Sequence, residues 1–98
     1  MKRTEAELRF RLTVEVDQKT GEIVAAYLLI RDGMSARVRE FADGSVIADY
    51  DSKGELLGIE LLGPFDVAVV DRIARRQPKP VRNFLLQSVP RGFQVANV

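Results

Sequence analysis

Hydrophobic and polar residues alternate strictly along the first regular segment of the chain, residues 8–16 (LRFRLTVEV). Its even positions hold leucine, phenylalanine or valine, and its odd positions hold arginine, threonine or glutamate. A period of two predicts a β-strand with one buried face and one solvated face. The next segment, residues 23–30, is apolar at every position, and its short length between polar turns favours a central strand over a buried helix.

Short glycine-containing turns separate three further strand-like segments, residues 35–41, 46–50 and 55–63. Two of these turns contain Asp-Gly, at residues 32–33 and 43–44, which is a hairpin signal. The regular spacing of the turns predicts an antiparallel meander over residues 1–63.

After Gly63 and Pro64 the apolar spacing lengthens to that of a helix, which we expect to run to Arg76. The sequence Gln-Pro-Lys-Pro at residues 77–80 ends this helix, and a second short helix follows as far as Ser88. The predicted fold class is α+β: an antiparallel five-stranded meander sheet with two short C-terminal helices on one face. Residues 1–98 are expected to form one domain, in which a helical, basic segment (64–98) follows the β-meander (1–63).

The composition narrows the function classes. The 98 residues include no cysteine and no histidine, so thiolate chemistry, disulfides and the commonest general base and metal ligand are excluded. The longest apolar run, residues 23–30, is far shorter than the ~20 residues that cross a bilayer. We therefore predict a cytoplasmic domain away from the membrane, with no catalytic residue, metal or cofactor.

Residues 49–60 (DYDSKGELLGIE) match the spacing of a calcium-binding loop, with Asp49, Asp51 and Glu60 at ligand positions. Lys53, however, would bring a cation to the position of the ion, and the flanking segments have strand periodicity where an EF-hand requires helices. We therefore predict a β-hairpin. An acid–base role for the three carboxylates is a weaker hypothesis than pairing with Arg37 or Arg39 across a solvated sheet face.

The same hairpin carries a family resemblance. The segment GSVIADYDSKGELLGIELLGP, with the LTVEVDQKTGEIVAAYLLIRDG and ARVREF pattern before it, resembles the domain of unknown function 2283 family over about residues 12–63. The resemblance implies a small β-rich bacterial or archaeal domain without an established activity. Residues 64–98 lie outside the pattern, so nothing about them follows from it.

Residues 72–98 contain basic side chains and no acidic one, although the whole chain has a net charge of only +1. Five of these basic residues are candidate contacts for phosphate or nucleic acid: Arg72, Arg75, Arg76, Lys79 and Arg82. Under this hypothesis the protein is a nucleic-acid-associated, antitoxin-like regulatory module. The alternative, which we favour, is that these side chains face the acidic sheet or the solvent.

The apolar segment at residues 23–30 suggests a second function class. Two helices cover only one side of a sheet, so the other side is expected to expose an apolar patch suited to a homodimer or a protein partner. The alternative is a closed or strongly curled sheet that covers this face internally. The residues predicted for this interface are Val24, Ala26, Leu28, Ile30, Ile47, Leu56 and Leu62. A self-associating interaction module is therefore the leading functional hypothesis, with nucleic-acid association as the alternative.

Overall fold

Five antiparallel strands form one sheet in the computed structural model, which describes residues 7–89. Their bounds are β1 (Leu8–Val16), β2 (Ile23–Arg31), β3 (Arg37–Phe41), β4 (Val46–Tyr50) and β5 (Leu56–Leu62). A short 3₁₀ turn, η1 (Ala42–Gly44), joins β3 to β4. Residues 1–6 and 90–98, and with them the end of the predicted 64–98 segment, lie outside the described residues.

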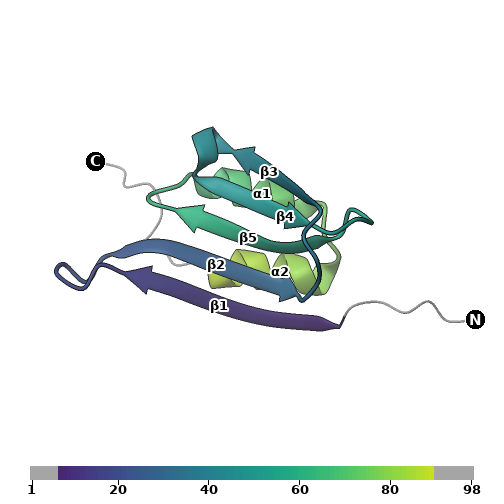
Figure 1. The fold of residues 1–98 in the computed structure, drawn as a ribbon, viewed down its shortest axis with the longest axis horizontal. Coiled ribbons are helices and arrows are strands. Elements are labelled where there is room, and N and C mark those ends of the chain that lie inside the picture. The colour runs from purple at the N-terminus through teal and green to yellow at the C-terminus, as the bar shows by residue number, and fades with distance from the viewer. Residues whose placement is uncertain (1–6, 90–98) are drawn as a thin grey trace, which may run out of the picture.

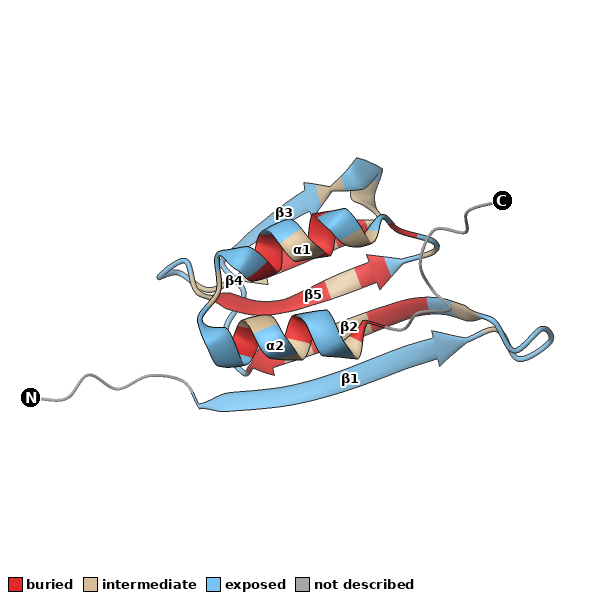
Figure 2. Ribbon diagram, turned by 180° about the vertical axis from the view of Figure 1, so that it is seen from behind, coloured by how far each residue is buried: buried red, intermediate tan, exposed pale blue. Residues whose placement is uncertain are grey.

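Two helices follow the sheet and pack on the same face of it (Figure 2). The first, α1 (Val67–Arg75), begins at Asp66, whose side chain accepts a hydrogen bond from the backbone N–H of Ala68 at 3.0 Å. The second, α2 (Lys79–Ser88), has proline in its first turn, where a missing N–H costs little. The predicted α+β fold class is confirmed. Neither described helix has the length and hydropathy needed to cross a membrane.

The order of the strands in the sheet is β1-β2-β5-β4-β3 (Figure 1). The last three strands form a continuous meander, and the β1–β2 hairpin joins it because β2 pairs with β5. Residues 32–36 therefore cross from β2 to the far edge strand, β3. The hairpin expected at Asp32-Gly33 does not form, because β2 and β3 are not neighbours.

Glycine at position 33 allows this crossing connection to approach the sheet closely. A Cβ atom added to Gly33 would lie only 2.8 Å from Cδ2 of Leu57. Leu57 is only 3% exposed and is not among the core residues that the helices cover. Gly33 therefore serves to bring the backbone close to the Leu57 side chain, and not to form a two-residue hairpin turn.

The hydrophobic core lies between the helices and the sheet. Its fully buried members come from the central strands, from the β5–α1 connection and from both helices, and the largest are Phe65, Leu28, Ile30, Leu56, Ile59, Leu61 and Leu85. In α1, Val69, Val70 and Ile73 are buried, which is the spacing of one helical face. The central strands β2 and β5 are therefore well covered on this side, whereas the two edge strands, β1 and β3, are left more open (Figure 2).

Candidate functional site

The apolar residues predicted to form an interface do not share one surface. Four of them are buried in the core of the chain itself: Ala26, Leu28, Ile30 and Leu56. No partner reaches these four side chains, whereas Val24 and Leu62 are exposed and Ile47 is partly buried. The assignment failed because β2 is apolar on both faces, so its pattern does not say which face the helices cover. A register shift between Asp49 and Tyr50 also changes the phase of Leu56 in β5.

An exposed apolar row lies instead on the edge strand β1. The five residues of the row are between 40% and 46% exposed: Leu8, Phe10, Leu12, Val14 and Val16. Leu12 and Val14 pair with the core residues Leu28 and Ala26, so they belong to the side of the sheet that carries the helices. Phe10 stacks on Phe84 of α2, with the ring centroids 4.5 Å apart. Beyond this contact, α2 leaves the row substantially open.

Residues 49–60, which match the spacing of a calcium-binding loop, form the predicted β-hairpin between β4 and β5. A carboxylate oxygen of Asp51 accepts hydrogen bonds from the backbone N–H of Lys53 at 2.8 Å and of Glu55 at 2.9 Å. Gly54 takes the positive φ value of 84° that the turn requires. Asp51 therefore organises the turn.

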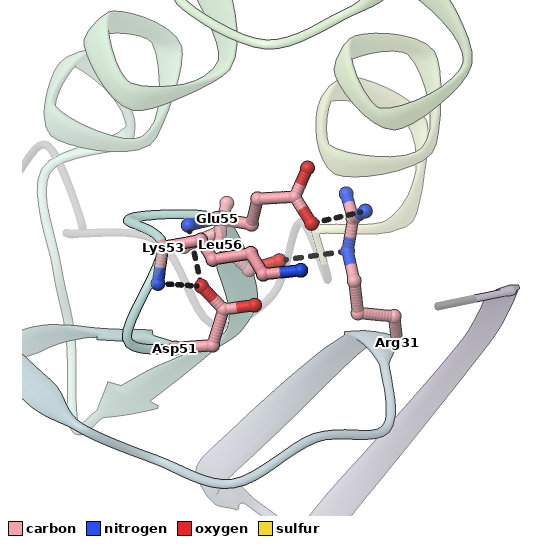
Figure 3. A network of polar contacts seen from close by, with 5 residues as sticks. All are labelled: Arg31, Asp51, Lys53, Glu55 and Leu56. Atoms are coloured by element: carbon pink, nitrogen blue, oxygen red, sulfur yellow. Dashed lines mark hydrogen bonds and ion pairs between the residues drawn. The ribbon is translucent and has the colours of Figure 1, made fainter. Parts of the chain in front are cut away.

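A buried arginine connects this hairpin to the end of β2 (Figure 3). Arg31 is only 6% exposed, and its Nε–H donates to the carbonyl oxygen of Leu56 at 3.2 Å. Its other contact is an ion pair with the carboxylate of Glu55 at 3.4 Å. Because a buried guanidinium is costly without partners, these contacts give Arg31 a structural role.

The turn is expected to lose stability in acid. The backbone N–H of Glu55, more than any other group, holds the pKa of Asp51 below its ordinary value of 3.8. A lowered folded-state pKa stabilises the fold fully above the unfolded-state value, and this contribution is lost as the pH falls through the folded-state pKa. Asparagine at this position keeps the hydrogen-bond acceptor but has no carboxylate to titrate.

Urea unfolding of the wild type and of Asp51→Asn, at neutral pH and below pH 3.8, measures this contribution. The stability advantage of the wild type is expected to shrink on acidification. An advantage of the same size at both pH values would contradict the role given to Asp51.

The face of the sheet opposite the helices has polar groups at its centre. Tyr27 pairs with Glu60 across the strands and lies over Gly58. Burial, and then the negative charges of Asp49 and Glu60, raise the pKa of the Tyr27 hydroxyl. The hydroxyl of Ser35, from the crossing connection, donates to Asp49. This face is therefore not the continuous apolar patch that the sequence suggested.

Arg37 and Arg39 do not pair with these carboxylates in the part of the chain that the structure describes. In the β3–β4 ladder, Arg39 is opposite Ala48, whose side chain lies in the core. Alternation along β3 places Arg37, Arg39 and Phe41 together on the helix-bearing side of the sheet. The period-two pattern of residues 37–41 places Arg37 and Arg39 on the same side as Phe41, so the sequence itself contains this signal.

The basic residues predicted to bind phosphate are divided by the structure. Arg72 in α1 and Arg76, which caps the end of that helix, line a cleft toward β3, and Arg75 and Lys79 lie outside it. All four side chains are exposed. Arg82 lies partly buried against the end of α1, where one of its guanidinium N–H groups donates to the carbonyl oxygen of Gln77 at 3.5 Å. The five residues therefore do not form one continuous basic stripe.

The cleft between β3 and α1 has a volume of about 610 Å³ and combines four arginines with two aromatic rings. Its described lining residues are Arg37, Arg39, Phe41, Tyr50, Gly54, Arg72, Ile73, Arg76 and Gln77. The guanidinium carbon of Arg39 lies 5.2 Å from the centroid of the Phe41 ring, in a cation–π contact. None of these lining residues is acidic, so the cleft is strongly electropositive.

Comparisons with known proteins assign no activity to these features. The chain matches no curated protein and no solved structure. One family, described as a protein of unknown function (DUF2283), matches residues 25–63, from within β2 to the end of β5. Both β1 and the two helices lie outside that match. Over residues 25–63 the chain is thus similar to DUF2283, which confirms the resemblance expected from the hairpin sequence.

Proposed function

We propose that this protein is a cytoplasmic, self-associating interaction module without catalysis of its own, and that two copies pair through β1. The observation that carries the proposal is the apolar row on β1, which lies beside an edge with no neighbouring strand in residues 7–89. The absence of cysteine and histidine supports the non-catalytic part of the proposal.

An unpaired edge strand presents a row of backbone N–H and C=O groups to any extended partner. Proteins commonly block such edges with a very short strand, proline, charged side chains or β-bulges. β1 is nine residues long and has no proline or lysine, and its register irregularities lie toward its two ends. The register with β2 shifts between Leu8 and Arg11 and again after Glu15, so the stretch from Arg11 to Glu15 is the regular part of β1. This stretch is the part best suited to accept another strand.

A second copy of the chain fits this stretch well. Antiparallel pairing of residues 11–15 with themselves places Thr13 on the two-fold axis, Leu12 opposite Val14 of the second copy, and Arg11 opposite its Glu15. Each copy thus supplies both an arginine and a matching glutamate on one face, and apolar side chains on the other. This charge complementarity supports a second copy of the chain as the partner.

The oligomeric state tests this proposal. At micromolar concentration the wild type is expected to have twice the mass of the 11.0 kDa chain by light scattering. Leu12→Lys places a charge in the paired apolar row and is expected to give the mass of one chain. The matched control is Val38→Lys, on the opposite edge strand β3, where the side chain is 56% exposed.

The control variant is expected to remain dimeric, and circular dichroism of both variants would show that they are folded. A wild type with the mass of one chain, or loss of the dimer in both variants alike, would count against pairing through β1.

Nucleic-acid association remains the alternative function, and it has less support. A regulatory module of that kind requires a basic surface that follows several phosphates, whereas the predicted basic residues are divided among different surfaces. Only Arg72 and Arg76 join other arginines, at a cleft the size of a small-molecule site.

A further inference from the structure

We propose that the cleft between β3 and α1 binds a nucleotide, with its phosphates held by Arg37, Arg39, Arg72 and Arg76. This site is distinct from the proposed dimer surface, because β3 and β1 are the opposite edges of the sheet (Figure 1). The proposal rests on the convergence of charge, on the absence of internal counter-charges and on the size of the cleft.

The four arginines converge from two rigid elements. Arg37 and Arg39 share the helix-bearing side of β3, two residues apart, and Arg72 lies in α1, four residues before Arg76, the residue that caps the C-terminus of that helix. Phe41 packs β3 against the core, Arg39 pairs with the core residue Ala48 of β4, and Ile73, next to Arg72, anchors α1. The four arginine side chains are themselves exposed, so packing fixes the backbone positions from which they extend into the cleft.

No carboxylate of the described chain neutralises this charge. Within residues 7–89, the ion pairs are those of Arg9 with Asp32 and of Arg31 with Glu55. The four cleft arginines therefore repel one another across a shared space, and an anion between them would relieve the repulsion. Guanidinium groups bind phosphate oxygens in a bidentate manner, so a phosphate-bearing ligand is the best match.

The size and lining of the cleft favour a nucleotide over inorganic phosphate. A volume of about 610 Å³ lies in the range of small-molecule sites and exceeds what one phosphate group fills. The Phe41 ring carries the guanidinium of Arg39, and Tyr50 adds aromatic surface on which a planar base can stack. Four guanidinium groups match the charge of a di- or triphosphate. A free nucleotide and a nucleotide within a single strand share this chemistry.

Binding of ATP, pyrophosphate, adenosine and a single-stranded oligonucleotide would be measured by titration calorimetry, at ionic strength matched with sodium chloride. We expect ATP to bind more tightly than pyrophosphate, and adenosine alone not to bind measurably. Arg72→Gln and Arg39→Gln are each expected to weaken ATP binding roughly tenfold or more, because each removes a charge-assisted contact.

Arg75→Gln is the matched control, since it removes the same charge from the same helix outside the cleft, and it is expected to change affinity by less than about twofold. Arg39→Lys keeps the charge but loses the guanidinium fork, so an intermediate affinity is expected. Melting temperatures without ligand would show that each variant folds. Removing a cleft arginine is expected to leave the melting temperature unchanged or to raise it, because the repulsion falls.

Each outcome decides the matter. Oligonucleotide binding that is tighter than ATP binding and is lost in Arg72→Gln would support the site and identify a strand as the source of the nucleotide. The proposal is overturned if neither ATP nor the oligonucleotide shows measurable binding at matched ionic strength. It is also overturned if Arg75→Gln weakens binding as much as Arg72→Gln does.

Discussion

Leu28→Ala is expected to lower the free energy of unfolding by about 2–5 kcal/mol. Leu28 is fully buried on β2 beneath the helices, so truncation removes apolar contacts and leaves a cavity. Had this residue formed an exposed interface, the same change would have weakened association and left the fold of one chain almost unaffected. Urea unfolding at several protein concentrations distinguishes the two cases, because only an interface effect depends on concentration.

The control for Leu28 is Val24→Ala, on the same strand. Val24 is 44% exposed, so its truncation is expected to cost less than about 1 kcal/mol. Equal costs at the two positions would contradict the burial that places Leu28, Ala26 and Ile30 in the core.

Gly58→Ala is expected to destabilise the fold by about 1–3 kcal/mol. A Cβ atom at Gly58 would lie 2.2 Å from the hydroxyl oxygen of Tyr27 and 3.0 Å from the backbone oxygen of Leu28. The ring of Tyr27 must move away from the sheet to make room, and it then loses its place between Asp49 and Glu60. Thermal unfolding measures the change.

A double-mutant cycle identifies the clash as the cause. In a Tyr27→Leu background, Gly58→Ala is expected to cost clearly less than in the wild type, because the shorter side chain does not reach over residue 58. An unchanged cost would attribute the loss to backbone contacts, such as that with the Leu28 oxygen, instead of to Tyr27.

Local sequence signals were sufficient for the elements of this fold. The strict alternation of residues 8–16 predicts β1 with its observed bounds, but the face expected to be buried is exposed. Pro80 lies in the first turn of α2 as expected, whereas α1 begins at Val67, after Pro64. The charge of Lys53 and the strand periodicity on both sides of it favoured a hairpin over a calcium loop, and β4 and β5 do form a hairpin. Both signals can be read from neighbouring residues alone. The fold class followed from these elements together.

The long-range arrangement was less accessible from the sequence. Nothing in the pattern of β2 says which of its two apolar faces the helices cover, so core residues such as Leu28 were assigned to an interface. The Asp32-Gly33 sequence is the same whether it forms a hairpin turn or, as here, part of a connection that passes over Leu57. The arginine cleft depends on bringing β3 against α1, about thirty residues later in the chain, and local periodicity carries no such information.

The most direct test of pairing through β1 uses two variants with opposite charge changes, Arg11→Glu and Glu15→Arg. In the proposed register each variant places like charges opposite each other twice in its own dimer, and a mixed dimer restores two opposite-charge pairs. Cross-strand pairs of this kind contribute about 0.2–1 kcal/mol each, so each variant alone is expected to dimerise roughly tenfold more weakly than the wild type.

Sedimentation equilibrium near the dissociation constant of the wild type would compare each variant with their equimolar mixture. The account predicts mostly single chains for each variant alone and a return to the average mass of the wild type in the mixture. A mixture whose mass is only the average of its two components would contradict pairing of Arg11 with Glu15 across β1, and with it the proposed dimer.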